Sequence, residues 1–337
     1  MTRNGKLSTP ARYIINAAAV VLLYLLLQTL LANGIIGRYY AKIINLMCVY
    51  IVAAVSLNLT CGFLGQLPLG HAGFMAIGAY TSALITKAVV LPGGEDVTFL
   101  AALLAGGLVA GMFGILIGLP ALRLKGDYLA IITLGFGEMI RVIIQNLGFT
   151  GGAMGLQGIP RYTTFTWGYI WVVVTIFVTY TLIHSRQGRA ILSIREDEIA
   201  AESCGIPTTY FKTLTFTAAA FFAGISGGLL AHHVAFIGPG DFNFMASIEI
   251  LVMVVLGGMG SIAGSVIAAG VLTLLPELLR AFSDWRMVIY SVLLVVVMIF
   301  RPSGLMGRYE FSLGRTLDRA LAALRRRPAQ KGGTNGD

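Results

Sequence analysis

The chain has 337 residues, of which 57% are hydrophobic and only 12% are charged, and its mean hydropathy is +0.83. Soluble globular domains carry about 25% charged residues, so these side chains cannot cover a water-exposed surface. The composition excludes an ordinary soluble domain and predicts an all-α, polytopic integral membrane helix bundle. The apolar runs are continuous and do not alternate with a period of two, which argues against a β-barrel.

Apolar runs of spanning length follow one another along the chain, by the criterion of about 20 residues per span. They cover residues 13–32, 43–61, 73–91, 98–119, 128–147, 168–184, 210–231 and 286–300. The first run is longer than a signal-peptide core and lacks a convincing cleavage site, so we interpret it as an uncleaved first span. A further stretch, 246–280, is broken by G-G-M-G-S-I-A-G (257–264). It predicts two short helices that meet at a glycine hinge, either spanning or re-entrant, which makes about ten membrane segments, eight of them full spans.

The basic residues predict the orientation of these segments. Arg3, Lys6 and Arg12 precede the first span, and most of the 24 Lys and Arg residues lie in the loops of that same side or in the tail. Because basic loops stay in the cytoplasm, both termini are expected inside. The same distribution accounts for the net charge of +9 without nucleic acid as a partner.

This orientation assigns the loops and divides the chain. The loop 185–210 and the tail after residue 301 are predicted to be cytoplasmic, and 92–97 and 148–167 external. The external loop 148–167 is rich in glycine and fits a flexible connection or a docking site equally well. We expect a transmembrane domain over 1–307 and a basic cytoplasmic tail over 308–337. In the tail, leucines at helical spacing among arginines predict a helix on the anionic inner leaflet of membrane lipid.

No pattern for catalysis, a metal or a cofactor is found in the sequence. The three cysteines are scattered, so no disulfide framework is implied. His232 and His233 are adjacent and point in different directions on a helix, which makes them poor joint metal ligands and favours an interfacial position. The phosphate-binding pattern G-x-x-x-x-G-K-[ST] is also missing. An ATP-driven process would therefore need a separate ATPase, and the chain itself is not predicted to be an enzyme.

A charged segment, S-I-R-E-D-E-I-A-A-E-S-C-G-I-P (193–207), interrupts the apolar sequence. Ser193 and Glu196 have the spacing of a capping box, which predicts a helix that starts near Ile194. Gly205 suits the left-handed position after a helix end, and Pro207 blocks continuation. The charged side chains are expected to stay solvated: Arg195, Glu196, Asp197, Glu198 and Glu202. The helix is either a solvated connector or inserts into a groove on a cytoplasmic partner.

A second unusual segment, G-F-L-G-Q-L-P-L-G-H (62–71), has three glycines and a proline at or near membrane depth. Irregular backbone at this depth is tolerated where it is buried in protein or lines a cavity. Gln66 and His71 are therefore candidates for a translocation path. An equally acceptable interpretation is that the glycines pack helices and the two polar side chains satisfy the broken backbone.

Two charges, Glu138 and Arg141, lie three residues apart near the middle of one span, so they share a helix face. An unpaired charge in hydrocarbon costs several kcal/mol, so they are expected to pair facing the bundle interior. A structural ion pair is favoured here over a functional one. Together with Thr133 on the same segment, they join the candidates for a translocation path.

The sequence resembles a known family in several segments. I-A-A-E-S-C-G (199–205) resembles the A-A-x-x-x-G core of the coupling loop of ABC importer permeases. Four further segments resemble the signature of the branched-chain amino acid ABC permease family of the LivM type, and in order they cover nearly the whole chain. They are L-N-L-T-C-G-F-L-G-Q-L-P-L-G-H-A-G-F-M-A-I-G-A-Y (57–80), K-G-D-Y-L-A-I-I-T-L-G-F-G-E-M-I-R (125–141), T-G-G-A-M-G-L-Q-G-I (150–159) and V-V-L-G-G-M-G-S-I-A-G (254–264).

The resemblance implies a permease subunit of an ATP-driven importer in the bacterial inner membrane. Its implied partners are a second, LivH-like permease, two cytoplasmic ATP-binding subunits and a periplasmic or lipoprotein solute-binding protein. The implied solutes are branched-chain amino acids, or urea and short amides, which close relatives carry. The implied ATPase-coupling residues are Arg195, Glu198, Ala200, Ala201 and Gly205.

Two other classes of function remain open from the residues alone. One is an ion-coupled secondary transporter that uses Glu138 and Arg141 as coupling charges, and the other is a membrane-embedded enzyme. The capped cytoplasmic helix favours the importer over both.

Overall fold

Nearly every described element of the chain is a helix. The computed structural model describes residues 9–34, 37–89, 92, 94–124, 126–301 and 304–307. The chain divides into two units, Met1–Gly37 with Glu310–Asp337, and Arg38–Tyr309. The first unit contains the helix α1 (Thr9–Ala32), and the second contains every other described element. The predicted basic tail and its amphipathic helix lie outside the described residues.

The second unit consists mainly of long apolar helices joined by short turns. The helices are α2 (Arg38–Asn58), which continues as a π-helical turn (Leu59–Phe63), α3 (His71–Ala88), α4 (Glu95–Ala121), α5 (Asp127–Asn146), α6 (Phe165–His184), α7 (Arg186–Glu196), α8 (Glu198–Ser203), α9 (Thr208–Val234), α10 (Phe244–Gly257), α11 (Ile262–Leu278) and α12 (Arg286–Phe300). Short 3-10 turns cover Gly148–Thr150, Gly152–Met154, Pro239–Phe242 and Leu279–Trp285, and two strands are β1 (Leu156–Gln157) and β2 (Phe236–Ile237).

Each predicted apolar segment overlaps a helix: the first overlaps α1, and the others overlap helices of the second unit. The predicted last span has the bounds of α12. Among the described residues, four helices are long and apolar enough to cross a membrane by themselves: Arg38–Phe63, Glu95–Ala121, Phe165–His184 and Thr208–Val234. Shorter apolar helices include α10 and α11, which are the two predicted halves of the broken stretch and meet at its glycines. The prediction of a polytopic helical membrane bundle is confirmed.

Glycines allow α3, α4 and α9 to pack with their backbones in contact. A Cβ added to Gly78 of α3 would overlap the backbone of Gly224 on α9, and one added to Gly106 of α4 would lie 2.7 Å from the carbonyl oxygen of Gly78. Small residues at such crossings allow close van der Waals packing, which drives helix association in lipid. These three helices form the most tightly packed part of the bundle, and the polar groups described below lie around it.

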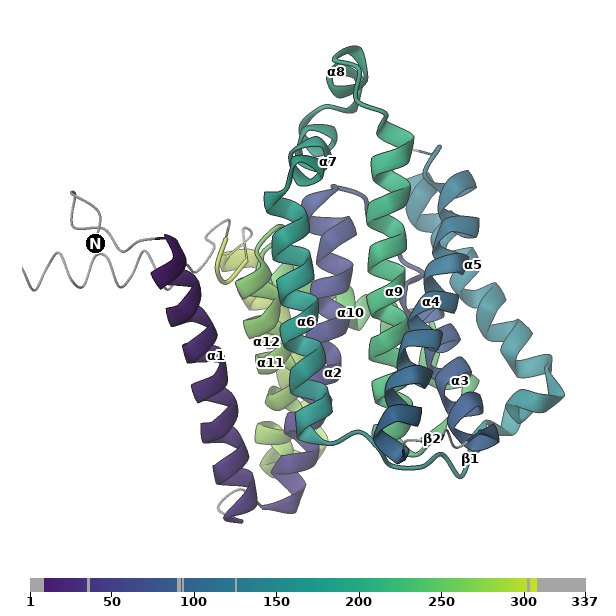
Figure 1. The fold of residues 1–337 in the computed structure, drawn as a ribbon, viewed down its shortest axis with the longest axis vertical. Helices are drawn as coiled ribbons and strands as arrows, with labels where there is room; N and C mark the ends of the chain where they lie inside the picture. The colour runs from purple at the N-terminus through teal and green to yellow at the C-terminus, as the bar shows by residue number, and fades with distance from the viewer. Residues whose placement is uncertain are drawn as a thin grey trace, which may run out of the picture. The chain divides into compact units, whose positions relative to one another are not determined.

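The connections lie at two opposite ends of the second unit (Figure 1). α7 and α8 project from one end, where they join α6 to α9, and β1 and β2 lie at the other end. The loops predicted to be cytoplasmic and external are thus at opposite ends, as the predicted orientation requires. The loop 148–167 is not an unstructured connection, because β1 pairs with β2 in antiparallel register, Leu156 opposite Ile237.

Candidate functional site

The loop between α6 and α9 folds as two short helices, α7 and α8, and not as one (Figure 1). The predicted helix start near Ile194 is wrong, because Ser193 lies inside α7 and its hydroxyl donates to a carbonyl of that helix. Asp197 caps α8 instead. Its Oδ1 accepts the N–H groups of Ile199 and Ala200 at 2.9 and 3.0 Å. An N-cap aspartate satisfies the donors that a helix start leaves without partners.

The predicted end of this segment is confirmed at Gly205, whose φ is +82°. The N–H of Ile206 donates to the carbonyl of Ala201 at 3.1 Å, and that of Gly205 donates to the carbonyl of Glu202 at 2.9 Å. This pair of bonds is the Schellman motif. The side chains of Ile206 and Ala201 belong to one apolar cluster, which is the hydrophobic contact that accompanies the motif.

Ala201 of α8 faces the bundle and is only 4% exposed. It packs in an apolar cluster with Ile191 and Ile194 of α7 and with Leu64, which follows the π-helical turn of α2. Ala201 therefore does not lie on the outer surface of the loop, where its predicted role in coupling would place it.

Glu198 is not solvated, contrary to the prediction. Its Oε2 pairs with Nζ of Lys212 on α9 at 2.7 Å, and the lysine side chain is only 3% exposed. Lys212 was not singled out from the sequence, because nothing near it in the chain indicates that a carboxylate 14 residues earlier folds back onto it.

The outer surface of α8 consists of other residues. Ile199 is 69% exposed, and Ala200 and Glu202 are also exposed. Of the five predicted coupling residues, Ala200 and Gly205 are exposed, and Arg195 is half-buried on the inner side of α7. Glu196 and Asp197 are exposed as predicted.

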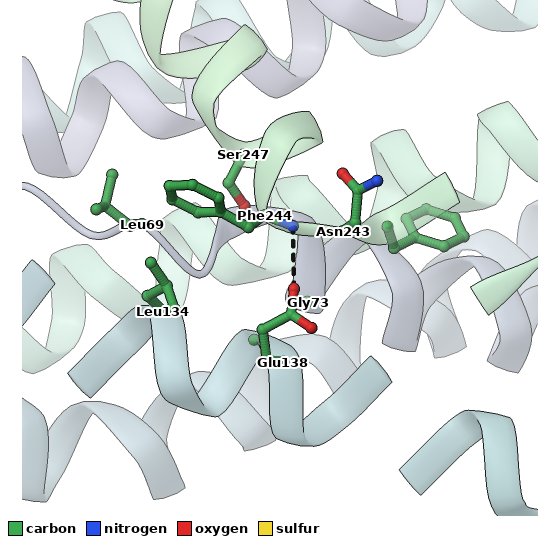
Figure 2. A pocket seen from close by; sticks show the side chains of 9 residues that line it. Leu69, Gly73, Leu134, Glu138, Asn243, Phe244 and Ser247 are labelled. Carbon is green, nitrogen blue, oxygen red and sulfur yellow. Dashed lines mark hydrogen bonds between the residues drawn. The ribbon is translucent and has the colours of Figure 1, made fainter. Parts of the chain in front are cut away.

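A narrow crevice, too small to admit a water molecule, lies between the start of α3, the middle of α5 and the start of α10 (Figure 2). Its lining residues are Leu69, Gly73, Leu134, Gly137, Glu138, Phe242, Asn243, Phe244 and Ser247. Close backbone contact shapes its base, since a Cβ on Gly73 would lie 2.9 Å from the Cα of Gly137.

Glu138 is the charged group of this crevice (Figure 2). Its Oε1 accepts the N–H of Phe244 at 3.1 Å, and its Oε2 accepts Nε–H of Arg141 at 2.6 Å. Phe244 begins α10, so the carboxylate lies at the positive end of that helix. The predicted ion pair is confirmed. The pair is half-buried in the single chain, with the Arg141 and Glu138 side chains 28% and 32% exposed, and Glu138 faces the start of α10.

Thr133 and His71, two other candidates for the translocation path, make hydrogen bonds at the start of α3. Thr133 Oγ1 accepts the N–H of Leu69 at 3.0 Å, and Nε2 of His71 lies 2.9 Å from Oγ of Ser56. Thr133 and His71 are each 2% exposed. Gln66 is half-buried in the irregular segment before α3 and is not among the lining residues of the crevice. The structure thus brings Thr133 and Glu138 together at the start of α3, and it places His71 in the packed interior.

The two predicted breaks, 62–71 and 257–264, meet through Asn58. Its Oδ1 accepts the N–H of Gly260 at 2.9 Å, and its Nδ2 donates to the carbonyl of Ser261 at 3.0 Å. Gly62 leaves room for this contact, since a Cβ there would overlap the Asn58 side chain. Asn58 was missed in the sequence. A lone asparagine next to a glycine-broken span was the available signal, but its partner is about 200 residues away in the chain.

His232 does not take the interfacial position predicted for it. It is fully buried, its Nε2 lies 2.9 Å from Thr86 Oγ1, and its Nδ1 lies 2.8 Å from the carbonyl oxygen of Gly228. Within the described residues, no group of three or more His, Cys, Asp or Glu side chains could hold a metal ion.

An apolar helical bundle with several helices long enough to cross a membrane defines a multi-pass membrane protein. The chain belongs to the family of permease components of branched-chain amino acid transport systems, whose model matches residues 39–301. This assignment confirms the resemblance seen in the sequence and the inner-membrane location that it implies.

Curated relatives agree with the family. The chain is 37% identical over 306 residues to the high-affinity branched-chain amino acid transport system permease protein LivM of Salmonella typhimurium, covering 80% of this chain and 71% of the relative. It is 37% identical over the same length to LivM of Escherichia coli. It is 28% identical over 295 residues to the permease protein LivH of E. coli, covering 79% of this chain and 94% of the relative. No solved structure matches the chain significantly.

Proposed function

We propose that this chain is a permease subunit of an ATP-driven importer that carries branched-chain amino acids or a related small polar solute. In this proposal it works with a second, LivH-like permease, two cytoplasmic ATP-binding subunits and a solute-binding protein on the outer side. The names of the relatives, which are transport permeases for these amino acids, support the solute class. The sequence contains no phosphate-binding loop, so the energy must come from separate subunits.

The observation that carries the proposal is the way in which α8 is held. A six-residue helix is not stable by itself in water, yet this one has a cap, a Schellman end, a buried alanine and an ion pair to a buried lysine. A solvated connector needs none of these. They fix a short helix at the end of the bundle with Ile199 facing outwards and 69% exposed, which suits a helix that fits into a groove on the ATPase.

The path for the solute is proposed to run along the face of α5 that carries Glu138 and Arg141. Charges at the middle of a span avoid lipid and face protein or a water-filled cavity, yet these two are about a third exposed in the single chain. A second permease packed over this face would enclose them. The ion-coupled alternative lacks a free carboxylate here, because both oxygens of Glu138 already accept hydrogen bonds.

The docking surface can be tested by changing Ile199 to Glu. A charge would replace the exposed apolar side chain without touching the contacts that hold α8, so the permease should reach the membrane at normal levels. Burial of an unpaired charge in the groove is costly, and we expect co-purification of the ATPase and uptake to be lost together. Replacing Ala201 is less informative, since its cluster within the permease would be disrupted.

The matched control is Met154→Glu, which replaces an equally accessible apolar side chain, 79% exposed, at the opposite end of the bundle. It should leave ATPase association unchanged. Normal association and uptake in Ile199→Glu would show that α8 is a solvated connector. Gradient-driven uptake by the lone permease, without ATPase, would favour the ion-coupled transporter instead.

A further inference from the structure

The side chain of Arg195 lies against both glycine-rich breaks, 62–71 and 257–264. A Cβ added to Gly65 would lie 3.0 Å from Cγ of Arg195, and one added to Gly260 would lie 2.9 Å from its Nη1. Both glycines have positive φ values, +75° and +87°. We call Asn58, Gly62, Gly65, Gly258, Gly260 and Ser261 the glycine junction. The backbone of the junction approaches the arginine so closely that any larger residue at position 65 or 260 would displace it.

Two helices end at the junction, and the Arg195 side chain lies beside the residues that follow each of them, Gly65 and Gly260. α2 continues to the end of its π-helical turn at Phe63, and α10 ends at Gly257. A helix C-terminus carries a partial negative charge of about half an electron, and a cation beside it is favourable. Within the described part of the chain, Arg195 makes no hydrogen bond or ion pair. Its charge therefore lies close to the ends of both helices without a charged partner of its own.

The helix that carries Arg195 is coupled mechanically to α8. Ile191 and Ile194 on the inner side of α7 are 0% and 4% exposed, and they share one apolar cluster with Ala201 of α8 and with Leu64, the residue before Gly65. Close-packed contacts of this kind transmit displacement because they cannot deform without opening voids. A shift of α8 would therefore move α7 and its arginine relative to the junction.

We infer that Arg195 is a positioning residue through which α7 and α8 control the glycine junction. With Arg195 in place, the ends of α2 and α10 are held together through its charge and through Asn58. When α8 is displaced, the charge is withdrawn and the two helix ends separate, which opens the bundle at this end. The inference rests on the proposed function, since it takes the ATPase as the partner that moves α8.

A disulfide reporter can follow the junction directly. Cys61 Sγ lies 3.7 Å from Met259 Sδ, on opposite sides of the junction. The Met259→Cys variant, with the exposed Cys204 changed to Ser, would be assembled with its ATPases and oxidised with copper phenanthroline. Allosteric coupling typically changes an equilibrium by about 5- to 150-fold. We expect ATP with vanadate to change the rate of disulfide formation in this reporter by about fivefold or more.

In the same background, Arg195→Ala should abolish the ATP-dependent change in cross-linking while the ATPase still co-purifies and hydrolyses ATP. Arg195→Lys should retain part of the change, because the ammonium keeps a positive charge near the helix ends. The matched control is Arg189→Ala, which removes an exposed arginine from the same helix. It should show the same ATP-dependent change in the rate of disulfide formation as the reporter without this substitution.

The outcomes separate the inference from the proposed function. An ATP-dependent change in Arg195→Ala equal to that of the reporter would overturn the role of Arg195 and leave the importer intact. Loss of the change in Arg189→Ala as well would overturn the specific role of position 195. If ATP changed nothing in the reporter with its ATPases bound, the inference would fail and the importer would stand, whereas uptake that needs no ATPase would overturn the proposed function.

Discussion

At the scale of single residues, the buried Lys212 has the largest expected effect on the position of α8, because it pairs with Glu198 of that helix. Its ammonium is removed from water in a side chain that is 3% exposed, and its partner Glu198 is 22% exposed. Transfer of a charge into such a site costs several kcal/mol, which only a close partner offsets. The pair therefore fixes the start of α8, which Asp197 caps, to α9.

The Glu198→Ala variant should lower the free energy of unfolding by about 3–5 kcal/mol, because it leaves Lys212 buried without its partner. The double variant Glu198→Gln with Lys212→Met should be more stable than that single variant, since no charge remains to be buried. Thermal unfolding of the purified chain in detergent measures both. The control Glu202→Ala, at an exposed position of the same helix, should change stability by about 0.5 kcal/mol or less. A double variant as unstable as Glu198→Ala would contradict this account of the pair.

Among the helices, α4 and α5 differ in what their partly exposed faces carry. Met112 on α4 is 68% exposed and has apolar neighbours. Leu134 on α5 lines the crevice, and because it lies four residues before Glu138 it shares the helix face that carries Glu138 and Arg141. Lipid is a poor environment for such charges, so the two faces should lie in different surroundings in the assembled transporter.

The Leu134→Cys and Met112→Cys variants test this difference in a Cys204→Ser background. A thiol reacts as the thiolate, which forms in water and not in hydrocarbon. In the assembled transporter, a water-soluble thiosulfonate should modify Leu134→Cys much faster than Met112→Cys. Mass spectrometry of the modified chain gives both rates. Equally slow reaction at both positions would place the α5 face in lipid and remove the proposed path.

For the whole molecule, sidedness follows from where the structure places the loops and from the basic residues near them. α7 and α8 lie at the end of the bundle opposite β1 and β2 (Figure 1). Arg186, Arg189 and Arg195 all lie on α7. Since loops rich in Lys and Arg remain in the cytoplasm, this end is predicted to face inside.

Cysteine labelling of intact cells tests the orientation. With the native Cys204 changed to Ser, an impermeant maleimide should label Met154→Cys, 79% exposed in the predicted external loop, and should not label Arg189→Cys until the cells are permeabilised. Gly151 is a poor position for the label, because its φ is +83° and a Cβ there would overlap the carbonyl of Gly155. Labelling of Arg189→Cys in intact cells would reverse the proposed orientation.

Local signals in the sequence determined a large part of this protein. Apolar runs of spanning length predicted the membrane helices, because a bilayer of fixed thickness requires about 20 apolar residues per crossing. The glycines at 257–264 predicted the hinge between α10 and α11, and Gly205 predicted the end of α8, because few other residues adopt a left-handed backbone at low cost. Glu138 and Arg141 were predicted to pair from their spacing alone. Each of these depends on residues near one another in the chain.

Only the tertiary structure decided which groups meet across the chain. Asn58 joins the two glycine breaks, Lys212 receives Glu198, and Arg195 turns inwards to the junction and not outwards to solvent. The choice of Asp197 over Ser193 as the cap also depended on packing, because Ile194 is buried against the bundle and keeps α7 helical past the predicted start. Such contacts depend on how distant helices pack, and side-chain periodicity carries no information about the partner of a buried polar group.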